Sequence, residues 1–390
     1  GYKVNYISNF TDVDDKIIKG AAEVGMDTKA FSDKFIAAFM EDVKQLGVKP
    51  ATKNPRVIDY MDEIIDFVKV LVDKGFAYEA NGDVYFRVAK SQNYAKLANK
   101  TLADLEVGAS GRVDGEGEIK ENPLDFALWK SAKPGEVSWQ SPWGEGRPGW
   151  HIECSVMATT ILGDTIDIHG GGADLEFPHH TNEIAQSEAK TGKTFANYWM
   201  HNGFVNVDNE KMSKSLGNFV TVHDMLKNVD GQVLRFFLAT QQYRKPVNFT
   251  EKAVHDASVN LKYLKNTFTL PLTEEADAAE LAKFKADFEA AMDDDFNTAN
   301  GITVIFDMAK WINSGNYNQA VKDTFAKMLA VFGIVFEEEV LDADIEALIE
   351  KRQAARANKD FATADAIRDQ LAAQGIKLLD TKDGVRWTRD

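Results

Sequence analysis

The sequence has only one cysteine, no long apolar run and no excess of positive charge. The single cysteine, Cys154, excludes a disulfide framework and suits a reducing compartment. No apolar stretch reaches membrane-spanning length and no signal-peptide pattern opens the chain, so a cytoplasmic protein without membrane contact is the default expectation. The net charge of −16 argues against non-specific binding to nucleic acid, which relies on broad positive potential. A specific RNA ligand that meets local basic groups stays open.

Two common motifs for nucleotide and metal chemistry are also missing. The sequence contains no Gly-x-x-x-x-Gly-Lys loop and no His-Glu-x-x-His pair. These absences exclude the usual phosphate loop of nucleotide triphosphatases and the usual helix of zinc proteases.

The chain is long enough for several domains, and its patterns change along its length. Its 390 residues are 44% hydrophobic, which predicts two to four units. Gly1–Ile7 alternates like a strand already under way, which predicts that the chain begins inside a domain. The predicted order is a strand and helices over 1–80, short strands and Gly/Pro/Trp-rich loops over 82–148, strand–helix alternation over 149–203, helices from about 231, helices at 343–357 and 361–373, and a strand-like end at 376–388.

A cluster of possible metal ligands lies in the middle of the chain. Cys154 occurs within thirty residues of four of the seven histidines. His179 and Glu183 are four residues apart, so they share one face of the helix predicted after Pro178. A thiolate, an imidazole and a carboxylate together suit Zn²⁺. The alternative for these residues is a buried free cysteine, a helix-capping histidine and a solvated carboxylate.

A short polar loop carries two lysines three residues apart. Lys211 and Lys214 lie in the string Lys-Met-Ser-Lys-Ser, which Gly217 follows. Two ammonium groups beside hydroxyls and backbone N–H groups can neutralise a triphosphate as charge builds on the leaving pyrophosphate. The alternative is a charged surface turn.

The Lys-Met-Ser-Lys-Ser string resembles the signature loop of class I aminoacyl-tRNA synthetases, and the surrounding motifs resemble the cysteinyl-tRNA synthetase family. The resemblance covers essentially the whole chain. The matching stretches are Asn9–Ile17, Gly146–Ser155, His169–Leu175, Phe177–Glu183, Met292–Thr298 and Ala364–Asp369. Position 181 departs from the family, because it is Thr where Glu is usual, but Glu183 is kept.

The family begins with a further zinc cysteine and a His-Ile-Gly-x motif that binds ATP, and neither occurs here. The expectation is therefore that this chain alone is impaired as an enzyme, although its RNA binding survives.

The resemblance implies an α/β Rossmann-like catalytic domain with an inserted segment, a helical bundle and a small α+β C-terminal domain. The implied boundaries are 1–232 for the catalytic domain, with an insertion at 82–148 and the signature-loop and stem-contact region at 203–232, then 233–340 for the bundle and 341–390 for an anticodon-binding domain. The motif regions 1–17, 146–154, 169–183 and 211–218 are expected to converge at one edge of a parallel sheet.

The implied function is ATP-dependent attachment of L-cysteine to tRNA(Cys) through a cysteinyl-adenylate, by a monomer. Zinc would select the substrate thiol, and Mg²⁺ would accompany ATP. The implied zinc ligands are Cys154, His179 and Glu183. The implied contacts to cysteine are Thr11, Trp150 and Asp174; those to ATP are His169, Gly170, Gly171, Gly172 and Lys214; and the catalytic lysines are Lys211 and Lys214. The candidates for anticodon contacts are Arg356, Asp365, Arg368, Asp380 and Trp387, each of which is equally well read as a surface charge or a packed aromatic.

Two other functions stay open at this stage. A cysteine ligase that acts on a small amine would share the zinc and adenylation motifs, but it would have no use for residues 341–390. A non-catalytic fragment that binds RNA or zinc is the second alternative.

Overall fold

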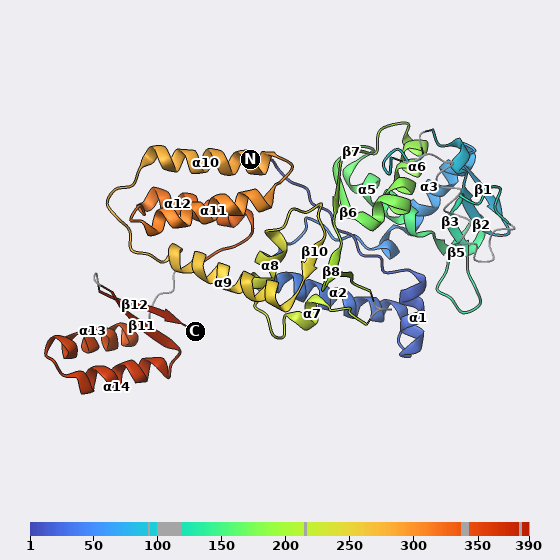
Figure 1. Cartoon of the computed structure of the whole chain (residues 1–390). Coiled ribbons are helices and arrows are strands. Elements are labelled where there is room, and N and C mark those ends of the chain that lie inside the picture. Colours follow the sequence, from blue (N-terminus) through green and yellow to red (C-terminus); the bar gives the residue numbers. More distant parts are fainter. Residues whose placement is uncertain (93, 100–118, 214–216, 337–342, 382–383, 390) are drawn as a thin grey trace. The chain divides into compact units, whose positions relative to one another are not determined.

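The computed structural model describes residues 1–92, 94–99, 119–213, 217–336, 343–381 and 384–389 (Figure 1). The chain forms two compact units, Gly1–Ile334 and Val335–Asp390. Within the described ranges, every helix is too short or too polar to cross a lipid bilayer.

The first unit opens with helices and an antiparallel sheet. The helices are α1 (Asp15–Glu23), α2 (Thr28–Gln45) and α3 (Met61–Asp73). The sheet has the strand order β1-β2-β3-β5-β4, from β1 (Ala77–Ala80), β2 (Asp83–Phe86), β3 (Phe126–Ser131), β4 (Trp139–Ser141) and β5 (Gly144–Pro148). Its described pairs are all antiparallel. This sheet occupies the stretch where the sequence changes from helical periodicity to short strands and turns.

A parallel βαβ unit follows and accounts for the α/β character of the chain. It consists of β6 (Ile166–Gly172), α6 (Thr181–Thr191) and β7 (Ala196–Asn202), and α5 (Trp150–Leu162) precedes it in the chain. β6 and β7 pair in parallel from Ile166 opposite Ala196 to Gly172 opposite Asn202. Parallel neighbours need a crossover connection, and α6 lies within it. Figure 1 shows α5 and α6 beside this strand pair.

Lys211, the first residue of the lysine loop, ends a strand of a three-stranded sheet with the order β10-β8-β9. Its strands are β8 (Val205–Val207), β9 (Glu210–Lys211) and β10 (Val247–Phe249), and the helices α7 (Val222–Met225) and α8 (Gly231–Ala239) lie between β9 and β10 in the chain. Asp208 and Asn209 join β8 to β9 with positive φ angles of 48° and 67°. Two consecutive residues of this kind form the turn that matches the twist of a tight hairpin.

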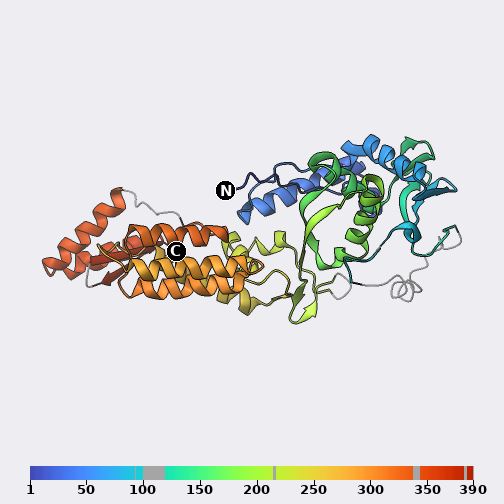
Figure 2. The ribbon, with the colours of Figure 1, turned by 90° about the horizontal axis from the view of Figure 1, so that it is seen from above.

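Four helices complete the first unit. They are α9 (Glu251–Phe268), α10 (Ala278–Asp293), α11 (Thr298–Asn313) and α12 (Gln319–Val331), and Figures 1 and 2 show α10, α11 and α12 running side by side. Each begins after a residue whose side chain accepts a hydrogen bond from the first turn, namely Thr250, Asp277, Asn297 and Asn318. The helical pattern predicted from about 231 is therefore confirmed.

The second unit pairs two helices with a hairpin. α13 (Ala343–Ala357) and α14 (Phe361–Ala372) match the two predicted helices. The strand-like end is an antiparallel hairpin of β11 (Ile376–Thr381) and β12 (Gly384–Arg389). Its small core contains Ile345, Ile367, Leu371 and Ile376, and Trp387 packs against it.

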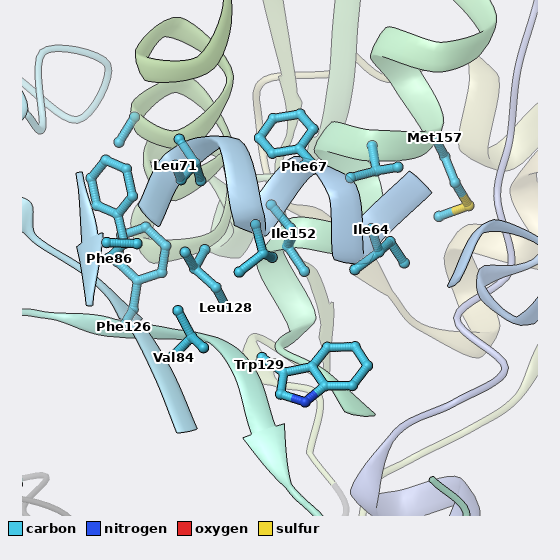
Figure 3. Packing of buried hydrophobic residues seen from close by; sticks show 14 of the residues in the cluster. Ile64, Phe67, Leu71, Val84, Phe86, Phe126, Leu128, Trp129, Ile152 and Met157 are labelled. Carbon is cyan, nitrogen blue, oxygen red and sulfur yellow. The ribbon is translucent and has the colours of Figure 1, made fainter. Parts of the chain in front are cut away.

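The main core of the first unit lies between α3, the antiparallel sheet and α5 (Figure 3). Ile64, Phe67 and Leu71 form one face of α3, as expected for apolar residues three and four positions apart. Leu128 from β3 and Ile152 from α5 are fully buried in the same cluster. This core holds α5 in place, and α5 carries Cys154 at its second turn.

Truncation of this core should destabilise the first unit strongly. Leu71→Ala should lower the free energy of unfolding by about 2–5 kcal/mol, because it leaves a cavity among fully buried neighbours. Lys69→Ala on the exposed face of the same helix should change it by less than about 0.5 kcal/mol. Urea denaturation followed by circular dichroism measures both. Equal effects of the two substitutions would contradict this assignment of the core.

Candidate functional site

The N-terminal segment is fixed against residues 53–56. Ile7 forms a parallel bridge to Lys53, and Phe10 forms one to Arg56. Asp12 is buried, and its carboxylate accepts a hydrogen bond from Arg56 Nε at 2.8 Å. These contacts hold the backbone on both sides of Thr11.

Cys154, His179 and Glu183 come together in the folded chain. Cys154 lies on α5, His179 lies in the short helical turn Glu176–His180 that leads into α6, and Glu183 lies in the first turn of α6. One ligand atom from each lies within 4.8 Å of the other two. His179 Nε2 is 3.1 Å from Glu183 Oε1. Sulfur, imidazole nitrogen and carboxylate oxygen form the type of donor set that Zn²⁺ prefers.

Further histidines surround this cluster. His151 Nδ1 is 2.9 Å from His179 Nδ1, and His169 Nε2 is 3.2 Å from Glu183 Oε1. His180 Nδ1 is 2.8 Å from His201 Nε2. One member of each His–His pair donates and the other accepts, so the tautomer of one ring sets that of its partner.

A second group of possible ligands shares Glu183. Atoms of His169, His180 and Glu183 also lie within 4.8 Å of one another, but this group contains no sulfur. The group with Cys154 therefore matches the softness of zinc better.

Burial and charge decide the protonation of these groups. Burial, with a contribution from His179, lowers the pKa of His151 to about 3. Burial likewise lowers the pKa of His180 to about 3. Burial opposes the charge of Glu183, but His169 and His179 outweigh it and hold the pKa of this carboxyl below its ordinary value. His151 and His180 are therefore neutral at physiological pH, while Glu183 is ionised.

The carboxylate of Glu183 can accept one more partner. Glu183 is fully buried, and within the described part of the chain its Oε2 atom has no hydrogen-bond partner. Burial, together with Glu183 and Glu153, raises the pKa of the Cys154 thiol well above its ordinary value. A buried carboxylate oxygen without a partner, beside a thiol and an imidazole, fits a bound cation that would compensate both acidic ligands.

One contact to the cluster comes from a residue to which the sequence assigned no role. Asn9 Nδ2 donates to Cys154 Sγ at 3.6 Å. Asn9 stands in the same stretch as Thr11, but 145 residues separate it from Cys154, so no local spacing could have indicated the contact.

Trp150 and the glycines of β6 shape the space around the cluster. The Trp150 ring lies 4.5 Å from the His179 ring between centroids, and 47% of the residue is exposed. A Cβ atom at Gly171 would come within 2.9 Å of His180 Cε1, and one at Gly172 would collide with Asp174 Oδ1. A side chain at position 171 would displace the buried His180 ring, whereas at position 172 the exposed Asp174 side chain would have to rotate away. Asp174 is exposed beside them.

Asn218 forms hydrogen bonds to the described residues at the start of the lysine loop. Asn218 Oδ1 accepts a hydrogen bond from Ser213 N at 2.9 Å, and Asn218 Nδ2 donates to Lys211 O at 3.3 Å. Lys211 Nζ lies 4.6 Å from the centre of the Phe204 ring. Lys214 lies outside the described residues. The structure thus describes three of the four motif regions and only the ends of the fourth.

The candidate anticodon residues of the second unit make contacts within that unit. Arg352 donates two hydrogen bonds to Asp380, at 2.9 and 3.0 Å, and Arg356 also pairs with Asp380. Arg368 pairs with Asp365 at 3.0 Å. Trp387 packs against the core, as described above. Arg356, Arg368 and Asp365 remain substantially exposed.

Three family models match successive parts of the chain. Residues 1–259 match the class I (C) catalytic domain of tRNA synthetases, residues 287–337 match the DALR domain, and residues 338–387 match the anticodon-binding domain of cysteinyl-tRNA ligase.

Curated relatives are similar over the whole chain. Cysteine–tRNA ligases of Streptococcus agalactiae serotype V, Streptococcus thermophilus and Streptococcus pyogenes serotype M6 are 87%, 83% and 81% identical over 390 residues, and the match covers 87% of each relative.

Among solved structures, the methionyl-tRNA synthetase of Mycobacterium tuberculosis matches with a TM-score of 0.57 and 14% identity, over 85% of this chain and 81% of that one. A putative arginyl-tRNA synthetase of Campylobacter jejuni matches with a TM-score of 0.52 and 14% identity, over 80% and 70%. These two likenesses concern the fold, and they confirm the predicted fold class.

The Asp380 ion pairs should make the second unit sensitive to acid. Hydrogen bonds from Arg352 hold the pKa of Asp380 at about 2, against about 3.9 in an unfolded chain. Because the folded pKa is the lower one, the carboxylate contributes stability above about pH 4 and loses it as the pH falls toward 2. Protection of α13 and β11 against hydrogen exchange should therefore fall between pH 5 and pH 3 in the wild type. Asp380→Asn should have weaker protection at pH 5 and a flatter pH dependence; identical profiles would contradict the prediction.

Proposed function

The chain belongs to the cysteinyl-tRNA synthetase family of class I aminoacyl-tRNA synthetases, and on this premise we propose that it selects L-cysteine through a zinc ion bound by Cys154, His179 and Glu183 before joining it to tRNA(Cys). The reaction has two steps. The cysteine carboxylate first attacks the α-phosphate of ATP to give cysteinyl-adenylate and pyrophosphate. The cysteinyl group then passes to the terminal ribose of the tRNA.

The observation that carries the zinc assignment is the convergence of three different ligand types. Sulfur, nitrogen and oxygen atoms from α5, the turn before α6 and α6 lie within 4.8 Å of one another. The unpartnered Oε2 of the buried Glu183 supports a cation at this place. Zinc bound here would supply a Lewis acid that prefers sulfur and keeps a substrate thiol deprotonated at neutral pH.

Selection through sulfur answers a difficulty in telling cysteine from serine. The two differ by one atom, and an apolar pocket discriminates poorly between such close isosteres. A pocket that recognises the thiolate chemically needs no second editing site. Trp150, whose ring is tilted against that of His179, would close one wall. Thr11 and the exposed Asp174 would orient the substrate, with Asp174 opposite its ammonium group.

The lysine loop and β6 would handle the nucleotide. Lys211, together with Lys214, would neutralise charge on the leaving pyrophosphate, and Mg²⁺ would accompany ATP. The last three residues of β6, before Asp174, carry no side chains, because they are Gly170, Gly171 and Gly172. His169 lies against Glu183 in the structure, so its side chain would support the metal ligand, with only its backbone near the nucleotide.

The C-terminal unit would bind the anticodon stem-loop. Residues 338–387 match the anticodon-binding model, which disfavours a ligase that acts on a small amine. Exposed Arg356 and Arg368 would face bases or phosphates, and exposed Asp365 would face base edges, whereas Asp380 and Trp387 would mainly hold the unit together. We further propose a monomer, in the cytoplasm where its tRNA substrate is used, with the domain boundaries at 232 and 340 expected from the sequence.

Loss of the cysteine ligand should remove both the metal and the selection. In Cys154→Ala, zinc should fall from about one ion per chain to a small fraction of that, because two protein ligands remain in the cluster. Cysteine-dependent ATP–pyrophosphate exchange should fall by on the order of 100-fold or more, as for loss of a group acting in the transition state. Metal analysis and exchange assays measure the two effects.

Thr160→Ala is the matched control, because Thr160 is exposed on the same helix. It should retain zinc and exchange activity. Unchanged zinc content in Cys154→Ala would refute the assignment of the metal site.

Removal of the loop lysines should slow adenylate formation without affecting zinc. Lys214→Ala should lower the rate constant of exchange by roughly 100- to 1,000-fold, and Lys211→Ala should lower it too, because each removes positive charge from the leaving pyrophosphate. Lys227→Ala, an exposed lysine paired with Asp224, is the control and should behave like the wild type. Full activity of both loop variants would show that neither lysine contributes to adenylate formation.

A further inference from the structure

The sulfur of Cys154 accepts a hydrogen bond from a residue of the N-terminal segment. The donor is the side-chain amide of Asn9, whose Nδ2 lies 3.6 Å from Sγ. Asn9 precedes α1, whereas Cys154 lies on α5. The contact therefore ties the N-terminal segment directly to a proposed metal ligand.

The backbone on either side of Asn9 is held by residues 53–56. Ser8 N donates to Lys53 O at 3.2 Å, and Phe10 N donates to Pro55 O at 2.9 Å. Asn54 Nδ2 returns a hydrogen bond to Ser8 O at 2.7 Å. A donor supported in this way is oriented before any metal arrives, which is what a precise metal centre requires.

The surroundings of Cys154 make a neutral donor useful. The Cys154 sulfur lies within 4.8 Å of a carboxylate oxygen of the buried Glu183, and a neighbouring carboxylate repels a thiolate. A metal-bound cysteine must nevertheless be a thiolate. An amide N–H offers the sulfur a positive dipole end without adding a net charge that would repel the cation.

Resting on the proposed zinc site, we propose that Asn9 is a positioning residue of the metal centre: its amide holds the Cys154 sulfur toward His179 and Glu183 and shares the negative charge of the metal-bound thiolate. Thr11, the proposed substrate contact, stands two residues further along the same anchored segment. Asn9 thus links the metal ligand Cys154 to the segment that is proposed to contact the substrate L-cysteine.

The test compares three variants of the enzyme. Asn9→Ala removes the donor, Asn9→Asp keeps the shape of the side chain but replaces the donor with an acceptor, and Asn54→Ala loosens the same segment without touching the sulfur. Zinc affinity is measured by competition with a chelator. The sulfur–metal bond is observed through the charge-transfer absorption of the Co²⁺-substituted enzyme.

The two Asn9 variants should bind zinc about 10- to 100-fold more weakly, the usual effect of losing an outer hydrogen bond to a metal ligand. Their Co²⁺ charge-transfer band should move to longer wavelength, because a sulfur without a donor holds its electrons less tightly. The KM for cysteine should rise more than the KM for ATP. Asn54→Ala should leave the band unchanged.

The outcomes separate this inference from the zinc assignment itself. A wild-type chain that binds no zinc even when the metal is added in excess would refute the metal site. If the wild type binds zinc but the Asn9 variants keep its affinity and its band position, the metal site stands and the role of Asn9 is wrong. Weaker binding without a band shift, matched by Asn54→Ala, would mean that segment rigidity matters and the hydrogen bond does not.

Discussion

Glu183 is a carboxylate with no exposure to solvent, and the catalytic region is built around compensating its charge. An ionised group that is removed from water needs partners, or it becomes neutral. His169 from β6 and His179 from the turn before α6 both contact its Oε1 atom, and its Oε2 atom has no hydrogen-bond partner in the part of the chain that the structure describes. The carboxylate thus joins the strand, the turn and the helix of the βαβ unit at a single atom.

The rest of the site follows from that arrangement. The histidines that contact Glu183 need their own partners, and His151 supplies one for His179. Packing several rings into a small volume leaves no room for side chains on the neighbouring strand, which is why a Cβ at Gly171 would strike His180. The glycines that the family pattern associates with the nucleotide therefore also have a packing role on the metal side of β6.

The second unit also contains a buried charged side chain that is compensated by a partner of opposite charge. Its core contains few large apolar residues, and small cores bury too little surface to be strongly stable. Arg352 is 6% exposed, and its guanidinium pairs through two hydrogen bonds with Asp380. An ion pair with this geometry contributes more to stability than an ion pair that is exposed to solvent. A residue proposed for RNA contact from its position alone is in this case also part of what holds α13 to β11.

The sequence by itself determined the family, the order of helices and strands in most of the chain, and the identities of Cys154, His179 and Glu183 as candidate ligands. These depend on local periodicity and on motifs whose residues are close together, such as His179 and Glu183. The contact of Asn9 with Cys154, the pairing of His180 with His201 and the tie between Arg352 and Asp380 were decided only by the tertiary structure. Each joins residues far apart in the chain, and hydrogen bonds depend on distances that no spacing rule encodes. The same holds for the side chain of His169, which lies against Glu183: a strand pattern predicts that a residue alternates between faces, but it does not say which buried charge that face will meet.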